Sequence, residues 1–334
     1  MQILEKFDPE LWEIARENME RVRLILETIE PYSDERRKVQ AFREILAELE
    51  SGNTAPRTAG NHFETEEVHV PRSDGDGNIR LAIFRPEGKS DTLPCLYFIH
   101  GGGMIVGSID NIREEATKLA NLLKVVVVAV EYRLAPEHPH PAPVNDCFDG
   151  FNWVARNAAK LGIDPSRIGM FGESAGGGLA AATALMIRDR GGSGLLFQVL
   201  IAPMLDDRND TPSSRQFSGV WPGWPREMNL LGWQALLGNS AGTDRVSEYA
   251  APSRASDLSD LPETYIEVAG LELFRDENIS YGQRLMEHNV PVEMHVYPGT
   301  FHSWHGLAPE AAVTKRAVRN RMEWIRRQYE SRKA

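Results

Sequence analysis

Apolar residues recur at helical spacing from Asp8 to about Glu50, with charged residues between them. A spacing of three or four positions places such residues on one face of a helix, so the pattern predicts amphipathic helices. The run Pro-Tyr-Ser-Asp at residues 31–34 interrupts the pattern, because proline lacks the amide hydrogen that a continuing helix requires. The sequence therefore predicts two opening helices, followed by a polar connection over residues 51–61.

The pattern changes after this connection. Residues 66–70 and 79–84 flank the run Asp-Gly-Asp-Gly, which predicts a hairpin. Short apolar runs then alternate with helical stretches such as residues 112–123 and 147–160. Short buried strands separated by helices indicate an α/β protein with a mostly parallel central sheet flanked by helices. The runs cover residues 96–99, 125–130, 168–171, 197–201, 265–268 and 292–296.

The segment 206–247 departs from this alternation. It holds three tryptophans among Gly and Pro residues that favour turns. The simplest interpretation is an insertion over one end of the sheet, which forms a mainly helical cap with residues 1 to about 55. The alternative is a surface loop that its tryptophans only anchor to the protein. We expect a single domain, 1–334, whose core comprises about 65–205 and 248–334.

Composition and charge argue against several classes of protein. The net charge of −11 opposes binding to nucleic acid, which requires a basic face. No apolar stretch reaches the roughly 18 residues of a membrane span. Residues 1–30 carry charges throughout and lack the apolar region of a signal peptide. We read Cys95 and Cys147 as buried small side chains and expect a cytoplasmic protein with no nucleic-acid or membrane partner.

Residues 172–176, Gly-Glu-Ser-Ala-Gly, lie between a short apolar run and an Ala-rich stretch that favours a helix. A G-x-S-x-G pattern in this context is typical of a nucleophile elbow, in which small flanking residues allow a sharp turn that exposes the serine hydroxyl. Ser174 is therefore the candidate nucleophile. Because the pentapeptide alone is a common string, the interpretation requires a base and an oxyanion site elsewhere.

Residues 100–103, His-Gly-Gly-Gly, follow directly on the strand predicted at 96–99. Glycines leave backbone amides unshielded and allow the positive φ values that point successive N–H groups one way, which suits a tetrahedral oxyanion. A Gly-rich turn after a strand also suits a phosphate, but neither G-x-G-x-x-G nor a trailing G-K-[ST] fits here. A loose glycine loop without a ligand is the other alternative.

These two segments and a third, Glu-Tyr-Arg-Leu-Ala-Pro-Glu-His-Pro at 131–139, resemble the successive signatures of the hormone-sensitive-lipase-like carboxylesterases of the α/β-hydrolase fold. The resemblance extends over residues 96–302. It implies that the amides of Gly101, Gly102 and Ala175 form an oxyanion hole, while His100 is structural and residues 132–139 form a supporting loop. The chain departs from the family at Glu173, where aspartate is usual.

The chain order of the triad in this fold, nucleophile, acid, histidine, places the base near the C-terminus. His302 follows a Tyr-Pro-Gly turn as the family's histidine does, and we favour it over His305. The family usually continues with Gly and an aromatic residue, whereas this chain has Ser303 and Trp304, and His305 itself begins a similar ending.

For the acid, Glu272 occupies the position that the family gives to an aspartate. Asp276 is the rival, but a short carboxylate at the start of the helix predicted at 277–287 is more often an N-cap. We therefore predict Glu272, because Glu is an accepted acid in this fold.

The predicted function is that of a serine carboxylesterase, which hydrolyses short- to medium-chain esters through an acyl-enzyme on Ser174 and requires no metal or cofactor. The alternatives are an amidase, lactonase or deacetylase with the same triad, and a non-catalytic small-molecule receptor on a hydrolase scaffold. Family relatives suggest a homodimer through the edge strand at 292–297. The candidate substrate-binding residues are the aromatic side chains of Trp12, Trp221, Trp224 and Trp233.

Overall fold

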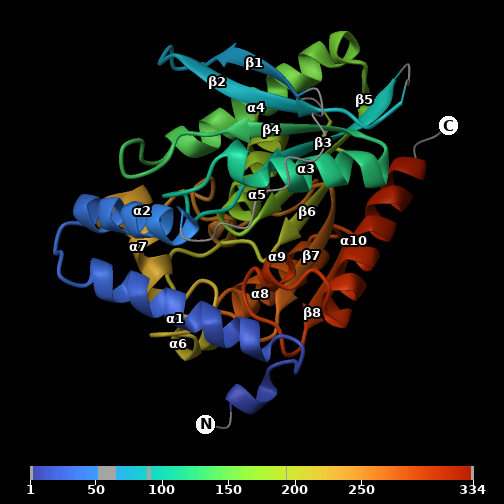
Figure 1. Ribbon diagram of the computed structural model, residues 1–334. Coiled ribbons are helices and arrows are strands. Elements are labelled where there is room, and N and C mark those ends of the chain that lie inside the picture. Colours follow the sequence, from blue (N-terminus) through green and yellow to red (C-terminus); the bar gives the residue numbers. More distant parts are fainter. Residues whose placement is uncertain (1–2, 52–64, 89–91, 193, 332–334) are drawn as a thin grey trace.

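The computed structural model describes residues 3–51, 65–88, 92–192 and 194–331. At its centre lies an eight-stranded sheet with the order β1-β2-β4-β3-β5-β6-β7-β8 (Figure 1). β2 pairs antiparallel with β1 and β4, and all other neighbours pair in parallel. The strands are β1 (Thr65–Pro71), β2 (Asn78–Phe84), β3 (Leu93–Ile99), β4 (Val126–Glu131), β5 (Ile163–Glu173), β6 (Phe197–Ile201), β7 (Glu263–Ala269) and β8 (Val292–Tyr297).

Every apolar run that the sequence marks as a strand lies in this sheet, so the predicted α/β fold is confirmed. The central strands β3, β4 and β6 are buried along nearly their whole length. Strands covered on both faces need no polar alternation, which is why they appear in the sequence as continuous apolar runs. The predicted hairpin forms β1 and β2 at one edge of the sheet, and β8 forms the other edge.

Helices cover the two faces of the sheet. On one face, Phe98 of β3 belongs to the same buried cluster as Leu119 of α3 (Ile109–Leu123) and Ile325 of α10 (Ala312–Glu330). Its neighbour Tyr97 points to the opposite face, because side chains alternate along a strand, and lies in the cluster that α4 (Ala142–Asn157) and α5 (Ala175–Asp189) line. The sequence patterns that we used did not predict α10.

The two amphipathic helices at the start of the chain are confirmed as α1 (Trp12–Ile29) and α2 (Glu35–Ser51). α2 packs against α7 (Arg226–Leu237), which belongs with α6 (Pro212–Gln216) to the segment 206–247 (Figure 1). Arg43 fastens α2 to the core, since it donates hydrogen bonds to the carbonyl oxygens of Ile105, at 2.8 Å, and Ala135, at 2.9 Å.

The N-terminal helices and the segment 206–247 thus lie together, as the cap hypothesis expects, although the cap as a functional unit stays a prediction. Of the connection predicted at 51–61, everything after Ser51 lies outside the described residues, as do residues 52–55 of the proposed cap. The remaining helices are α8 (Arg275–Glu287), α9 (Trp304–Leu307) and the short 3₁₀ turns η1 (Leu4–Lys6), η2 (Ala158–Leu161), η3 (Gly238–Ser240) and η4 (Pro252–Arg254).

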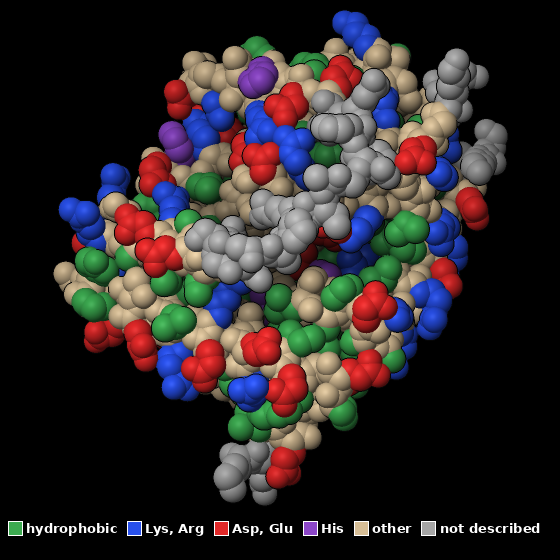
Figure 2. All heavy atoms as spheres, in the orientation of Figure 1, with side chains coloured by type: hydrophobic (Ala, Val, Ile, Leu, Met, Phe, Trp, Pro, Cys, Tyr) green, Lys and Arg blue, Asp and Glu red, His purple; other side chains and the backbone are tan. Residues whose placement is uncertain are grey.

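Within the described residues, no helix has both the length and the apolar character needed to cross a membrane. The face drawn in Figure 2 carries acidic and basic side chains interspersed with one another. The sequence has 48 acidic and 37 basic residues, which gives the net charge of −11.

Candidate active site

Ser174 lies in a sharp turn between β5 and α5, with φ 56° and ψ −122°. The flanking glycines make this turn possible. A Cβ atom on Gly172 would lie 2.2 Å from the carbonyl oxygen of Gly176, and one on Gly176 would lie 2.1 Å from that of Ile99. Any larger residue would therefore clash with backbone. The Ser174 amide donates to the Ile201 carbonyl at 2.8 Å, which anchors the turn to the end of β6.

The structure brings Ser174, His302 and Glu272 together from three loops that are far apart in the sequence. The Nε2 atom of His302 lies 3.0 Å from the Ser174 hydroxyl, and its Nδ1 atom lies 2.5 Å from Oε2 of Glu272. The three residues are between 1% and 6% exposed. Each follows the carboxyl end of a parallel strand, and these ends meet at the same edge of the sheet.

The partners of His302 determine which of its nitrogens carries the proton. A carboxylate only accepts hydrogen bonds, so Nδ1–H must donate to Glu272. Nε2 is then free to accept the proton of the Ser174 hydroxyl. The other oxygen of Glu272 accepts from the Ala269 amide at 2.6 Å, which fixes the carboxylate toward the histidine.

The rival residues lie elsewhere. His305 places Nε2 at 3.3 Å from Glu173, and Asp276 accepts from the Ser213 amide at 2.7 Å and from Arg275. Asp276 is also not the N-cap that its position suggests. The cap of α8 is Phe274, and Asp276 lies in the first turn, where its carboxylate still favours the positive end of the helix.

The glycine loop at 101–103 lies against this elbow. Gly102 and Gly103 have φ values of 112° and 60°, which glycine adopts readily. A Cβ atom on Gly101 would lie only 3.3 Å from Cβ of Ser174, so the first glycine of the loop approaches the nucleophile closely. Ala175 begins α5, and the first amides of a helix have no partner within it. Gly101 and Ala175 thus lie beside the serine, and the oxyanion hole of Gly101, Gly102 and Ala175 stays a prediction.

His100, at the start of this loop, is fully enclosed. Burial lowers the pKa of its imidazole to about 4, so the ring is neutral near pH 7. Nδ1–H donates to the Gly101 carbonyl at 2.8 Å, and the ring stacks on Tyr132 with a centroid separation of 4.2 Å. The Tyr132 hydroxyl in turn donates to the His100 carbonyl at 2.9 Å. These contacts connect the glycine loop to the segment after β4.

A cavity of about 680 Å³ opens over Ser174. Of the tryptophans predicted to bind substrate, only Trp224 lines it. The structure places Trp12 and Trp221 around Phe7, and Trp233 is buried in α7. The apolar wall instead includes side chains from α1, α2, α7 and the loop after β4, which the sequence reading missed: Val22, Ile25, Phe42, Leu46, Leu134 and Met228.

Trp224 connects the cavity wall to the glycine loop. Its ring occupies the space in which a Cβ atom on Gly103 would lie, at 2.3 Å, and it meets the edge of Phe42 from α2 with a centroid separation of 6.0 Å. The segment 206–247, helix α2 and the oxyanion loop therefore pack on one another at a single point.

We expect Gly103→Ala to destabilise the protein by about 1–3 kcal/mol, because the new methyl group overlaps the Trp224 ring. Gly219→Ala is the matched control: Gly219 also has a positive φ, 73°, but a Cβ atom there meets nothing within 4 Å. Urea unfolding measures the free energy of unfolding of both variants. Both carry the strain of a positive φ, so the additional loss in Gly103→Ala measures the overlap with Trp224. Equal losses of stability in the two variants would show that the contact with Trp224 is unimportant.

The fold and the Ser-His-Glu arrangement define the class of α/β-hydrolase serine hydrolases. A family model described as the alpha/beta hydrolase fold matches residues 96–306. Esterase LipI of Mycobacterium tuberculosis is 35% identical over 81% of this chain and 82% of its own length. Carboxylesterase NlhH of the same species is 35% identical over 70% of this chain and 74% of its own length.

Solved structures agree with these sequence relatives. The structure titled "Bacterial Heroin Esterase" is 37% identical with a TM-score of 0.85, and covers 98% of this chain and 99% of its own. Esterase LipW from Mycobacterium marinum is 28% identical with a TM-score of 0.80, and covers 98% of this chain and 97% of its own. The chain therefore belongs to the hormone-sensitive-lipase-like carboxylesterases and is an ester-hydrolysing enzyme.

Proposed function

We propose that Ser174 is the nucleophile of this esterase, His302 its general base and Glu272 the carboxylate that orients the histidine. The observation that carries the proposal is the continuous chain of contacts from Ser174 through His302 to Glu272, at 3.0 and 2.5 Å. His302 removes the hydroxyl proton while Ser174 attacks the ester carbonyl. His302 then returns that proton to the departing alcohol, which leaves an acyl-enzyme.

The amides of Gly101, Gly102 and Ala175 stabilise the negative charge that develops on the carbonyl oxygen in each of the two steps. In the second step His302 takes a proton from a water molecule that attacks the acyl-enzyme, and it returns this proton to the Ser174 oxygen as the acid product leaves. The close approach of Gly101 to Ser174 and the place of Ala175 directly after it support this role, since donors of an oxyanion hole must lie close to the carbon that is attacked.

Labelling with a fluorophosphonate tests the assignment of the nucleophile. We expect one covalent adduct, and peptide mass spectrometry should locate it on Ser174. Activity that persists without any adduct on Ser174, or an adduct on another serine that abolishes activity, would contradict the proposal. The relatives that are named esterases and the complete Ser-His-Glu chain favour an enzyme over a receptor. A panel of matched esters, anilides and lactones distinguishes an esterase from an amidase or lactonase.

For the substrate, we propose esters with short- to medium-chain acyl groups. The cavity of about 680 Å³ is large enough for a small ester, and its apolar wall suits an aliphatic chain or an aromatic alcohol. The structural relative titled a heroin esterase suggests that bulky alcohol groups are also accommodated, which the same ester panel can test.

Leu46→Ala should shift the preference toward longer acyl chains, because Leu46 lines the cavity from α2 and its truncation lengthens the space. The matched control is Leu49→Ala, since Leu49 is another half-buried leucine of α2 that is not among the lining residues. Specificity constants for p-nitrophenyl esters of increasing length measure the shift, expected at about 10-fold for each methylene group of the acyl chain that the enlarged space accepts. A parallel shift in both variants would assign the effect to helix packing.

Two further proposals concern the oligomeric state and the cellular location of the enzyme. We propose a homodimer through β8, because this strand lies at the edge of the sheet and an exposed edge can pair with a second copy. Light scattering after size exclusion measures the mass directly. A cytoplasmic location is also proposed, and cell fractionation tests it.

A further inference from the structure

Two departures from the family's motifs meet at one point of the structure. Glu173 replaces the usual aspartate before the nucleophile, and Ser303 replaces the usual glycine after the histidine. The Ser303 hydroxyl donates to Oε1 of Glu173 at 3.2 Å, and Nε2 of His305 lies 3.3 Å from the same oxygen. Two residues of the loop that carries His302 thus contact the residue that precedes Ser174.

The backbone of Ser303 lies in a conformation that favours glycine. It adopts φ 60° and ψ 22°, a left-handed conformation that glycine accommodates more readily than serine. A glycine here would relieve the strain but would lose the hydroxyl that reaches Glu173. Glutamate also extends one methylene further than aspartate, which increases its reach toward Ser303 and His305.

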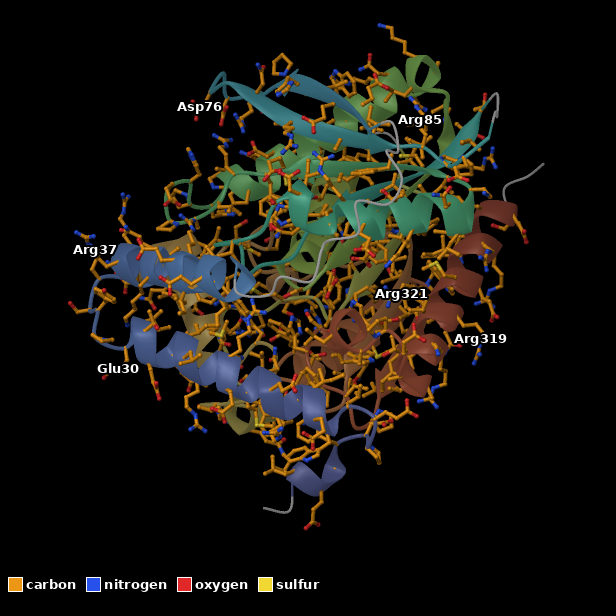
Figure 3. All side chains as sticks on the ribbon, in the orientation of Figure 1. Glu30, Arg37, Asp76, Arg85, Arg319 and Arg321 are labelled. Atoms are coloured by element: carbon orange, nitrogen blue, oxygen red, sulfur yellow. The ribbon has the colours of Figure 1, made fainter. Side chains whose placement is uncertain are left out.

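Charged groups from three other elements surround this contact. Glu115 of α3 places a carboxylate oxygen within 4.8 Å of a carboxylate oxygen of Glu173 and of a ring nitrogen of His305. Arg321 extends from α10, on the side of the helix away from Arg319, and pairs with Glu267 of β7 at 2.8 Å (Figure 3). Glu173 is 19% exposed and His305 is 10% exposed in their side chains, so water screens the pair only weakly.

We propose that Glu173, Ser303 and His305 are positioning residues, which lock the loop carrying His302 to the elbow carrying Ser174. This inference rests on the function proposed above. None of the three needs to touch the substrate. Their contact sets the distance between hydroxyl and imidazole, on which the proton transfer depends steeply, since a displacement of about 1 Å can cost 100-fold in rate.

The electrostatics of the cluster give the contact a pH dependence. Burial would lower the pKa of His305, but the carboxylate of Glu173 raises it above its usual range, and the nearby Glu115 adds to this effect while Arg321 opposes it. Burial likewise opposes ionisation of Glu173, yet the charge of His305 lowers the pKa of that carboxyl. Because the pKa of His305 is raised, the ion pair is fully present below about pH 6.5 and is lost as the pH rises through the raised value.

The test compares Ser303→Gly, Glu173→Asp and His305→Gln with the wild-type enzyme over a range of pH. We expect each to lower kcat by about 10-fold while KM changes little, because substrate contacts are kept. The wild-type kcat should decline at alkaline pH, and this decline should disappear in His305→Gln. His288→Gln is the matched control, since His288 also lies near a carboxylate, Asp257 at 4.0 Å, but belongs to the end of α8.

Ser303→Gly makes the experiment decisive, because glycine readily adopts the local φ and the variant is therefore expected to fold. An unchanged kcat in Ser303→Gly, or an alkaline decline that persists in His305→Gln, would overturn the proposal. Loss of wild-type activity in EDTA with recovery on adding Zn²⁺ would also overturn it, since the cluster would then act as a metal site. Fluorophosphonate labelling of Ser174 in the wild type tests the nucleophile separately. If the labelling fails, the function proposed above is wrong. If it succeeds and kcat is unchanged in Ser303→Gly, only the positioning role is wrong.

Discussion

Ser174→Ala should reduce the turnover of p-nitrophenyl butyrate by about 10⁴-fold or more, because no other group can take over the covalent step. The substitution removes only the oxygen that forms the acyl-enzyme and leaves His302 and Glu272 in place. Steady-state kinetics at neutral pH measure the loss. The small activity that remains should come from substrate binding and the oxyanion amides.

The same variant provides its own structural control. Alanine fits the space of the serine side chain, so circular dichroism and the midpoint of thermal unfolding should stay close to those of the wild type. The fluorophosphonate adduct should disappear. If a correctly folded Ser174→Ala protein hydrolysed the ester at the wild-type rate, the nucleophile would have to be another residue.

The elbow and the glycine loop could be predicted from the sequence because each carries a short, recognisable pattern. A residue larger than glycine at 172 would clash with the carbonyl of Gly176 in the same turn, and one at 176 would clash with the carbonyl of Ile99 in a neighbouring strand, so the turn requires glycine at both positions. Strands β3, β4 and β6 were predictable for a similar reason, since burial on both faces leaves an unbroken apolar run. In each case the pattern lies within a short segment of the sequence, even where the contact that requires it does not.

The remainder of the site depends on contacts across long sequence separations. His302 and His305 are three positions apart, and although the turn before His302 favours it in the sequence, only the structure shows its approach to Ser174. Trp12 and Trp221 resemble cavity residues in the sequence, but their rings pack near Phe7. The cluster around Glu173 was equally hidden, because its members come from α3, β5, α10 and the loop after β8. Glu173 and Ser303 are visible in the sequence as departures from the family pattern, but their contact is not.

Glu272→Gln should lower kcat by about 10³–10⁴-fold while the geometry of the site is largely kept. The amide of glutamine has the size of the carboxylate, but its nitrogen donates a hydrogen bond, so it can favour the wrong tautomer of His302. It also no longer stabilises the positive charge that the imidazole acquires during attack. The measurement is kcat for p-nitrophenyl butyrate at neutral pH.

Asp276→Asn is the matched comparison, because it makes the same carboxylate-to-amide change four residues further along. Asp276 accepts hydrogen bonds from the Ser213 amide and from Arg275, and the cost of its replacement should appear in stability. We therefore expect kcat to fall less than about 10-fold in this variant, since His302 keeps its partner. The opposite ranking would make Asp276 the acid. The contact of 2.5 Å between His302 and Glu272 would then describe a resting arrangement that rearranges before the reaction.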